Sequence, residues 1–99
     1  IVSGFNVYPN ELEQALTQHP DVLECAAIGI ADPKAGEVVK MFVVANNEAL
    51  TAEQVKEFCK ANMAGYKVPK FVEFRNDLPK SNVGKVLRKE LKAEEKAKL

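Results

Sequence analysis

The sequence predicts an α+β fold in which helices pack on a small, mainly antiparallel, three-stranded sheet. Two apolar runs at residues 22–30 and 38–45, with a short turn between them, are typical of a β-hairpin. Helical spacing of apolar residues precedes this hairpin and follows it. A short aromatic run at residues 71–74 supplies one more strand. With 99 residues, we expect a single domain spanning residues 1–99.

The chain is predicted to start with a short extended segment at residues 1–7, followed by a helix. Pro9 suits the first turn of a helix, where its missing N–H has no intrahelical acceptor. Leu12 and Leu16 then share one helical face. His19 and Pro20 end this helix, and we expect His19 to cap its C-terminus rather than to act in catalysis.

The middle of the chain is predicted to form the hairpin and a second helix. Residues 32–36 contain Asp, Pro and Gly, which indicates a turn and therefore antiparallel pairing of the flanking strands. Thr51 and Gln54 have the spacing of a capping box. We expect the helix that follows to place Phe58 in the core and to end at Gly65 with a left-handed cap.

A final helix is predicted to start near Val86 or Leu87 and to fray through residues 93–99, which are rich in Lys and Glu. Its leucines Leu87 and Leu91 lie four residues apart and would anchor it on the core. The predicted elements thus follow the order strand, helix, hairpin, helix, strand and helix. This order is also compatible with βαββαβ folds.

Composition places the chain among ordinary soluble domains, with 46% hydrophobic and 28% charged residues. Net charge is zero, but residues 1–64 carry a balance of −5 and residues 65–99 a balance of +5. The basic half could face an anion or could be a solvated helix surface. Cys25 and Cys59 lie in apolar stretches, so we expect buried free thiols and no metal site. Because the chain begins with Ile, we expect an excised piece of a larger protein.

One lysine stands out at the junction of a loop and the last helix. Residues 79–84 (PKSNVG) are rich in turn formers and predict an exposed loop, which Lys85 follows directly. Gly84 would allow unusual backbone angles and close approach of another molecule. The pair is not a phosphate-binding P-loop, because Pro79 and Val86 occupy the places of its glycine and its Ser/Thr. From this local pattern alone, we expect Lys85 to be a solvated surface lysine.

Three segments resemble the adenylate-forming enzymes, a family of acyl-CoA synthetases, peptide-synthetase adenylation domains and luciferases. Residues 79–88 (PKSNVGKVLR) resemble the lysine signature near the C-terminus of that family, and residues 3–13 (SGFNVYPNELE) resemble the loop after its inter-domain hinge. Residues 65–70 (GYKVPK) resemble a third, weaker segment. The three segments occur in the same order as in the family and cover essentially the whole chain. Their sequences are most similar to those of bacterial long-chain fatty-acid–CoA ligases.

The resemblance implies that this chain is the mobile C-terminal domain of a two-domain ligase. Such an enzyme activates a fatty acid with ATP to an acyl-adenylate and then transfers the acyl group to CoA. Lys85 would be the catalytic lysine of the first step, and Ser3, Gly4 and Phe5 would form the loop on the CoA side. Gly84 and Lys67 are accessory candidates.

The resemblance also implies which partners and cofactors the domain lacks by itself. ATP with Mg and the fatty acid would bind mainly on the missing large N-terminal domain, so the isolated fragment is expected to be inactive. The full enzyme would be cytoplasmic or would associate peripherally with a membrane. The terminal Ala97-Lys98-Leu99 resembles a peroxisomal signal and would matter only as a native eukaryotic terminus.

Two alternatives stay open at this point. One is another adenylate-forming acid–CoA ligase with a different acid. The other is a non-enzymatic ferredoxin-like binding module of the kind that includes RNA-recognition domains. The predicted strands offer Phe42 but no stacking motif, and the net charge is zero, so we expect no nucleic-acid binding.

Overall fold

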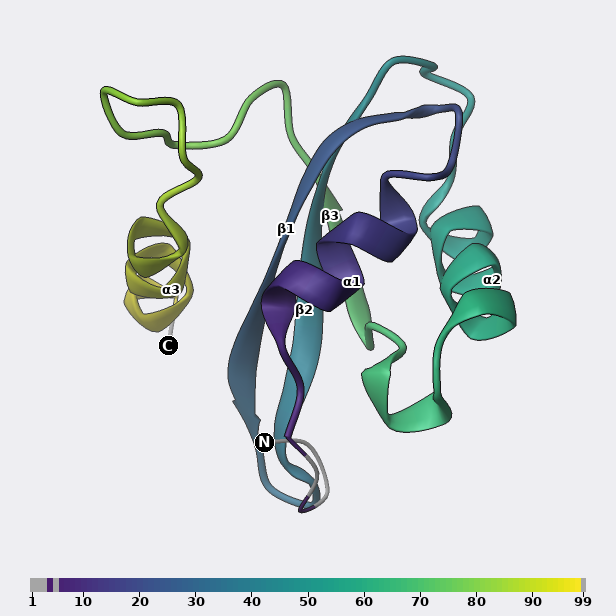
Figure 1. Ribbon diagram of the computed structural model, residues 1–99. Helices are drawn as coiled ribbons and strands as arrows, with labels where there is room; N and C mark the ends of the chain where they lie inside the picture. The colour runs from purple at the N-terminus through teal and green to yellow at the C-terminus, as the bar shows by residue number, and fades with distance from the viewer. Residues whose placement is uncertain (1–3, 5, 99) are drawn as a thin grey trace.

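The computed structural model describes Gly4 and residues 6–98 of the chain. Their elements are, in order, α1 (Pro9–Leu16), β1 (Val22–Asp32), β2 (Gly36–Ala45), α2 (Ala52–Asn62), the 3₁₀ helix η1 (Gly65–Lys67), β3 (Phe71–Phe74) and α3 (Arg88–Ala97) (Figure 1). The predicted α+β class is confirmed, as are the positions of the hairpin and of the third strand. The extended segment expected at residues 1–7 lies largely outside the described residues.

The sheet has the order β1-β2-β3, with β2 in the centre. β1 and β2 pair antiparallel over almost their full length, with Cys25 opposite Val43 and Ile28 opposite Lys40. The turn between them is held by Asp32, whose Oδ2 accepts the backbone N–H groups of Lys34 and Ala35 at 3.0 and 2.8 Å. This turn is therefore of the kind that Asp side chains favour.

β3 pairs with β2 in parallel, with Lys40 opposite Phe71 and Val43 opposite Phe74. The sheet is thus mixed, although the long antiparallel pair dominates it. The parallel pair follows from the connection, because α2 carries the chain back before β3 begins. A ferredoxin-like fold would place another strand between these two strands, so the described residues do not form that alternative fold.

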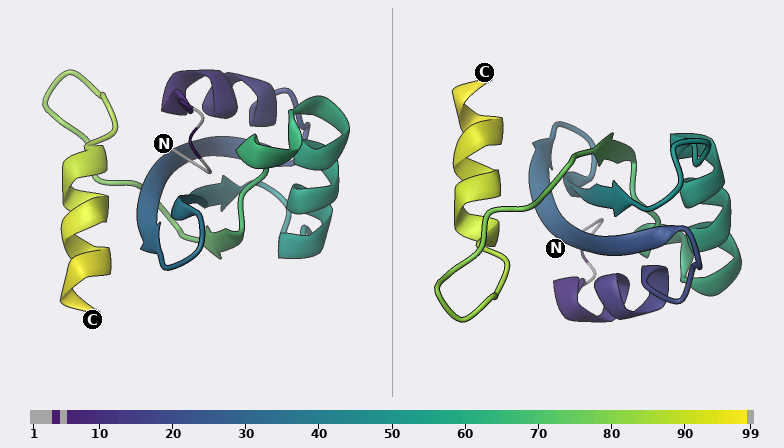
Figure 2. Two further views of the ribbon diagram at one scale, coloured as in Figure 1. Left: turned by 90° about the horizontal axis from the view of Figure 1, so that it is seen from below. Right: turned by 90° about the horizontal axis from the view of Figure 1, so that it is seen from above.

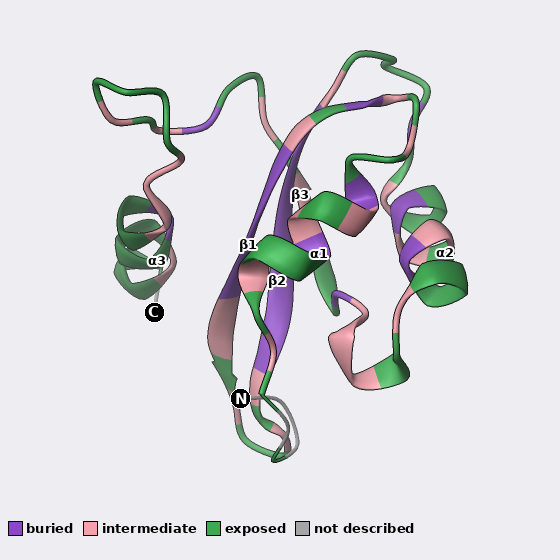
Figure 3. Cartoon of the chain, in the orientation of Figure 1, coloured by how far each residue is buried: buried purple, intermediate pink, exposed green. Residues whose placement is uncertain are grey.

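Both faces of the sheet are covered by helices, which gives two apolar clusters (Figure 2). α1 and α2 cover one face, where Met41 and Val43 of β2 meet Leu12, Val55 and Cys59. α3 covers the other face, where Phe42 meets Leu78 and Leu91. β2 is consequently buried along most of its length (Figure 3), as its near-continuous apolar sequence requires.

Local sequence signals explain where the first two helices begin. Pro9 occupies the first turn of α1. At α2, the Thr51 hydroxyl accepts the Gln54 N–H at 3.1 Å, and the Gln54 side chain accepts the Thr51 N–H at 3.0 Å. The predicted capping box is therefore confirmed. In the described part of the chain, no helix has both the length and the apolar character needed to cross a membrane.

Three local predictions are wrong. α2 ends at Asn62 with Met63 extended against the core, and Gly65 opens η1 without a positive φ. The His19 side chain does not cap α1, although its backbone N–H donates to the Leu16 carbonyl at 2.9 Å: Nδ1 accepts the Asp21 N–H at 3.0 Å, and the ring packs edge-on against Phe58. The third concerns α3, which does not fray at residue 93.

α3 stays helical through Ala97 because its second half is held by ion pairs to the sheet. The Lys40 ammonium lies 2.7 Å from Glu95 Oε1, and Arg75 Nη1 lies 2.6 Å from Glu94 Oε1. These contacts are tertiary, so the local composition of residues 93–98 gave no sign of them.

Candidate functional site

The loop that carries Lys85 is closed by backbone hydrogen bonds. Lys80 and Val86 form an antiparallel bridge, the Ser81 N–H donates to the Lys85 carbonyl at 2.8 Å, and the Leu87 N–H donates to the Pro79 carbonyl at 2.8 Å. Within this frame the Gly84 N–H donates to the Ser81 carbonyl at 2.9 Å, which closes a tight turn. Lys85 therefore leaves a short, hydrogen-bonded hairpin rather than an irregular loop.

Gly84 is required by the backbone of this turn. Its φ is +81°, a conformation that residues with a Cβ atom rarely adopt. A Cβ atom built there would meet nothing within 4 Å, so space is not what the glycine supplies. Gly84 thus supplies the backbone conformation of the turn that precedes Lys85.

Lys85 itself is exposed, and its backbone N–H donates to Ser81 Oγ at 3.3 Å. Its ammonium makes no hydrogen bond or ion pair with any residue that the structure describes. Lys89 is similarly unpaired among the described residues, so the free charge alone does not distinguish Lys85. The distinguishing feature is the ordered turn that precedes Lys85, in which Val83 is also exposed.

Two ion pairs hold the base of the loop, one at each end. At the start, Lys80 Nζ lies 2.9 Å from Glu24 Oε2 on β1. At the end, Arg88 makes a two-point contact with Glu13 on α1: Nη2 lies 2.5 Å from Oε1, and Nε lies 3.0 Å from Oε2. Sequence reasoning missed Arg88 and Glu13 as a pair, because nothing local indicates which carboxylate an arginine 75 positions away will meet.

The second candidate segment lies apart from this loop. Ser3 and Phe5 are outside the described residues. Gly4 is exposed with φ +83°, and a Cβ atom there would meet nothing within 4 Å. In Figure 1 the segment leading into α1 runs at the end of the molecule with the β1–β2 turn, whereas the loop before α3 lies at the opposite end. The described structure does not bring the two segments together.

Lys67, the other accessory candidate, is committed to a structural contact. It ends η1, and its ammonium lies 3.2 Å from Glu11 Oε2 on α1 and 5.8 Å from the centre of the Tyr66 ring. The pair links η1 to α1 on the face of the sheet opposite α3. Lys67 therefore does not join Lys85 in one site within this domain.

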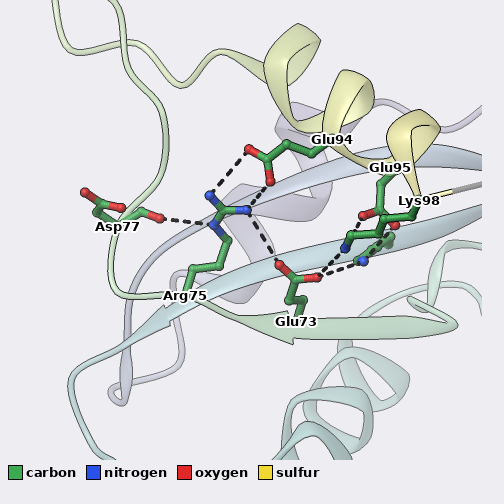
Figure 4. A network of polar contacts seen from close by, with 7 residues as sticks. Glu73, Arg75, Asp77, Glu94, Glu95 and Lys98 are labelled. Atoms are coloured by element: carbon green, nitrogen blue, oxygen red, sulfur yellow. Dashed lines mark hydrogen bonds and ion pairs between the residues drawn. The ribbon is translucent and has the colours of Figure 1, made fainter.

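A network of charged groups fastens α3 to the sheet (Figure 4). Lys40 is almost fully buried, and its ammonium lies 3.0 Å from Glu73 Oε1 and 2.7 Å from Glu95 Oε1. Lys98 reaches the same two carboxylates at 3.3 and 2.8 Å. Burial by itself raises the pKa of Glu73 and of Glu95, but the hydrogen bonds from Lys40 and Lys98 outweigh it and hold both pKa values below their usual range.

Arg75 extends this network toward the start of the loop. Its guanidinium pairs with Glu94 on α3 at 2.6 Å and lies 3.6 Å from Glu73 Oε2, while Nε donates to the Asp77 carbonyl at 3.4 Å (Figure 4). Glu94 in turn raises the pKa of Arg75 by hydrogen bonding to it. α3 is therefore held by charges at its C-terminal half and by Leu91 in its middle.

No metal centre is formed by the described residues, since no three His, Cys, Asp or Glu side chains gather as ligands. A cavity of about 420 Å³ lies between β1 and α3, lined by Gly29, Ile30, Ala31, Lys92 and other residues, and it contains neither Lys85 nor Gly4. Among the described candidate residues, Gly4, Gly84 and Lys85 are exposed, and none of them lines this cavity.

The α+β fold and the exposed lysine after an ordered turn are compatible with the resemblance to the C-terminal domain of adenylate-forming enzymes. The model of the family described as AMP-binding enzyme C-terminal domain matches residues 11–85, so the chain belongs to that family. A long-chain-fatty-acid–CoA ligase from Escherichia coli O6:H1 is 56% identical to it over 99 residues, which are all of this chain and 18% of that protein.

Solved structures agree with this assignment. A fatty acyl CoA synthetase from Mycobacterium tuberculosis superposes with a TM-score of 0.91 at 38% identity, covering 99% of this chain and 20% of that one. An amide bond synthetase from Marinactinospora thermotolerans superposes with a TM-score of 0.89 at 31% identity, covering 95% of this chain and 19% of that one. The chain therefore spans about a fifth of the length of the proteins it matches.

Proposed function

We propose that the chain is the C-terminal domain of a long-chain fatty-acid–CoA ligase. The enzyme would convert a fatty acid and ATP to an acyl-adenylate and pyrophosphate, and then transfer the acyl group to the thiol of CoA. The observation that carries the proposal is the closed turn at Ser81–Lys85, which holds an uncommitted ammonium at the surface of a domain of this family. The 56% identity to the Escherichia coli ligase supports the long-chain acid as substrate.

In the first step Lys85 would stabilise negative charge on the reacting groups. The carboxylate oxygen of the fatty acid attacks the α-phosphorus of ATP, and the bond to the pyrophosphate oxygen breaks. Negative charge is shared between the entering carboxylate and the phosphate oxygens during this transfer. A lysine ammonium has three N–H donors on a flexible stem and can hydrogen-bond both groups at once. Lys85 would therefore position the reactants and stabilise the transition state.

In the second step the domain would present its other end. The segment leading into α1 and the loop before α3 lie at opposite ends of the domain in Figure 1, so one orientation of the domain would not place both at the same adenylate. We propose that the domain rotates between the steps, withdrawing Lys85 and bringing up Ser3, Gly4 and Phe5. Gly4 carries no side chain and would leave room for the pantetheine arm of CoA beside the backbone.

ATP with Mg and the fatty acid would be held by the large domain of the same enzyme. The described residues offer no cluster of metal ligands, and Lys85 is exposed on its turn. A bound Mg²⁺ would neutralise phosphate charge, and this domain would add only the ammonium. The partner surface is therefore the active-site face of that large domain.

Two half-reaction assays in the full-length enzyme test the assignment of Lys85. Lys85→Ala should reduce ATP–pyrophosphate exchange by roughly two to three orders of magnitude, the usual cost of losing one preorganised donor. CoA transfer from supplied acyl-adenylate should stay near normal. The matched control is Lys89→Ala, since Lys89 is also exposed and unpaired among the described residues. Near-normal exchange in Lys85→Ala, or equal loss in both assays, would contradict the role.

Gly4 is tested by the opposite pattern. Gly4→Asn keeps a residue type that tolerates positive φ, whereas Gly4→Leu adds both bulk and backbone strain. Because the proposed effect is obstruction of the pantetheine arm, both variants should slow CoA transfer and spare exchange. If Gly4→Asn transfers normally and only Gly4→Leu fails, the glycine serves backbone conformation and not passage of CoA.

A second acceptor chemistry is favoured by one observation. The amide bond synthetase superposes on this chain nearly as well as the fatty acyl CoA synthetase does. The fold of this domain is therefore compatible with transfer of an activated acyl group to an amine. Supplying the full-length enzyme with acyl-adenylate and either CoA or an amine separates the two, and we expect CoA to be the faster acceptor.

A further inference from the structure

The contact between Arg88 and Glu13 joins the lysine loop to the opposite part of the domain. Arg88 is the first residue of α3, three positions after Lys85. Its guanidinium meets the Glu13 carboxylate at two points, 2.5 and 3.0 Å, and Nη2 also donates to Asn10 Oδ1 at 2.7 Å. The pair is partly shielded, with side-chain exposures of 33% for Arg88 and 17% for Glu13. Two-point, partly buried contacts of this kind fix geometry better than a single surface contact does.

Glu13 is itself a rigid anchor. Besides Arg88, its Oε2 accepts the backbone N–H of Ala27 in β1 at 2.9 Å. Glu13 lies on α1, one position after the buried Leu12, so its backbone is fixed by the core. Its carboxylate thus connects α1, β1 and the start of α3 at one point. A movement of Arg88 relative to the sheet would break its hydrogen bonds to Glu13 and Asn10 on α1, while Glu13 stays held by the Ala27 N–H of β1.

The loop transmits this anchoring to Lys85. Leu87, the neighbour of Arg88, donates its N–H to the Pro79 carbonyl at 2.8 Å, and the Lys85 carbonyl accepts the Ser81 N–H at 2.8 Å. The four residues from Lys85 to Arg88 therefore form a backbone segment that is hydrogen-bonded to residues 79–81 and fixed at its end by the Arg88 guanidinium. Tilting Arg88 would displace the whole turn.

Resting on the function proposed above, we propose that Arg88 is a positioning residue for the adenylation step, and that Glu13 is the group against which it holds Lys85 in place. Neither side chain needs to touch substrate. A displacement of about 1 Å of a reacting or stabilising group costs up to roughly 10²-fold in rate. Because Lys85 acts only in the first step, loss of the Arg88–Glu13 contact should lower ATP–pyrophosphate exchange and leave CoA transfer unchanged.

The test is a double-mutant cycle in the full-length enzyme, measured by ATP–pyrophosphate exchange. Arg88→Ala is expected to lower exchange by about tenfold to 10²-fold. Arg88→Lys keeps the positive charge but can contact Glu13 at only one point, so its loss should be smaller. Glu13→Gln is expected to resemble Arg88→Ala. In a Lys85→Ala background, Arg88→Ala should cause little further loss, since the group it positions is gone.

The matched control is Arg75→Ala. Arg75 also forms an arginine–glutamate pair with α3, at 2.6 Å, but at the far half of the helix. It should leave exchange within about twofold if the effect depends on holding the turn rather than on general docking of α3. Lys80→Ala removes the one-point, more exposed pair at the other end of the loop and should have a smaller effect than Arg88→Ala.

The outcomes separate the two proposals. If Lys85→Ala leaves exchange unchanged, the proposed function fails and the positioning role fails with it. If Lys85→Ala abolishes exchange while Arg88→Ala and Glu13→Gln are silent, only the positioning role is overturned. The same holds if the Arg88→Ala loss is fully additive with Lys85→Ala, or equals that of Arg75→Ala. Should Arg88→Ala fail to fold, Arg88→Lys and Glu13→Gln carry the same cycle.

Discussion

Removing one carboxylate from the network under α3 should destabilise the domain by an amount that the contacts allow us to work out. The change is Glu95→Gln, which keeps the shape of the side chain and removes its charge. Glu95 accepts hydrogen bonds from Lys40 at 2.7 Å and from Lys98 at 2.8 Å, and its side chain is 15% exposed. The decisive partner is Lys40, which is 8% exposed and cannot reach bulk water without moving α3.

Glu73 would then be the one carboxylate left on the Lys40 ammonium, at 3.0 Å, and it is shared with Lys98. A hydrogen bond to a charged group contributes about 1.5–3 kcal/mol, and the remaining solvent contact of Glu95 reduces this. We therefore expect a loss of about 2 kcal/mol in the free energy of unfolding. With a urea dependence of about 1–3 kcal/mol per molar, the unfolding midpoint should fall by roughly 1 M.

The assay is urea unfolding of the domain followed by circular dichroism. Glu90→Gln is the control, since Glu90 is exposed on the same helix and should cost less than about 0.5 kcal/mol. In a Lys40→Met background the cost of Glu95→Gln should shrink, because no buried charge then depends on it. A Glu95→Gln loss no larger than that of Glu90→Gln would refute the view that this network holds α3.

Two further predictions concern titration of the same domain. The pKa values of Glu73 and Glu95 are held low in the folded state, so their contribution to stability is present at neutral pH. This contribution is lost as the pH falls below the ordinary glutamate pKa of about 4.3 and through the lowered pKa values. In acid unfolding the wild-type domain should therefore lose more stability over that range than Glu95→Gln, and parallel curves would contradict this. Burial raises the pKa of Cys25 to about 12 and that of Cys59 to about 11, so both thiols should resist a disulfide reagent at pH 8 in the folded domain and react at once in urea; rapid modification without urea would show that the core opens.

Local chemistry explains why much of the structure could be predicted from the sequence. The capping box at Thr51 involves residues three apart, and the Asp32 turn involves its own neighbours, so each forms wherever the backbone allows it. The turn formers at residues 79–84 likewise predicted an exposed loop before Lys85, but the backbone hydrogen bonds that close this loop were found only in the structure. The correct predictions depend on residues close in sequence.

Local signals failed where a longer contact prevailed. Met63 continues into an extended segment because its side chain packs on the core, which displaces the cap expected at Gly65. The His19 ring contacts Phe58 across the domain, and only the backbone N–H of His19 bonds the helix end beside it. In each case the tertiary contact contributes more than the local alternative, and no pattern within a few residues indicates it.

The sequence alone determined the hairpin, the three helices and the presence of a lysine directly after the turn residue Gly84. The tertiary structure alone decided that α3 covers the second face of the sheet, that β3 runs parallel to β2, and that Arg88 meets Glu13. The physical reason is distance along the chain. Backbone turns and caps depend on neighbours, whereas a guanidinium finds a carboxylate 75 positions away only after burial of Leu91 and Leu12 has brought their helices to the same sheet.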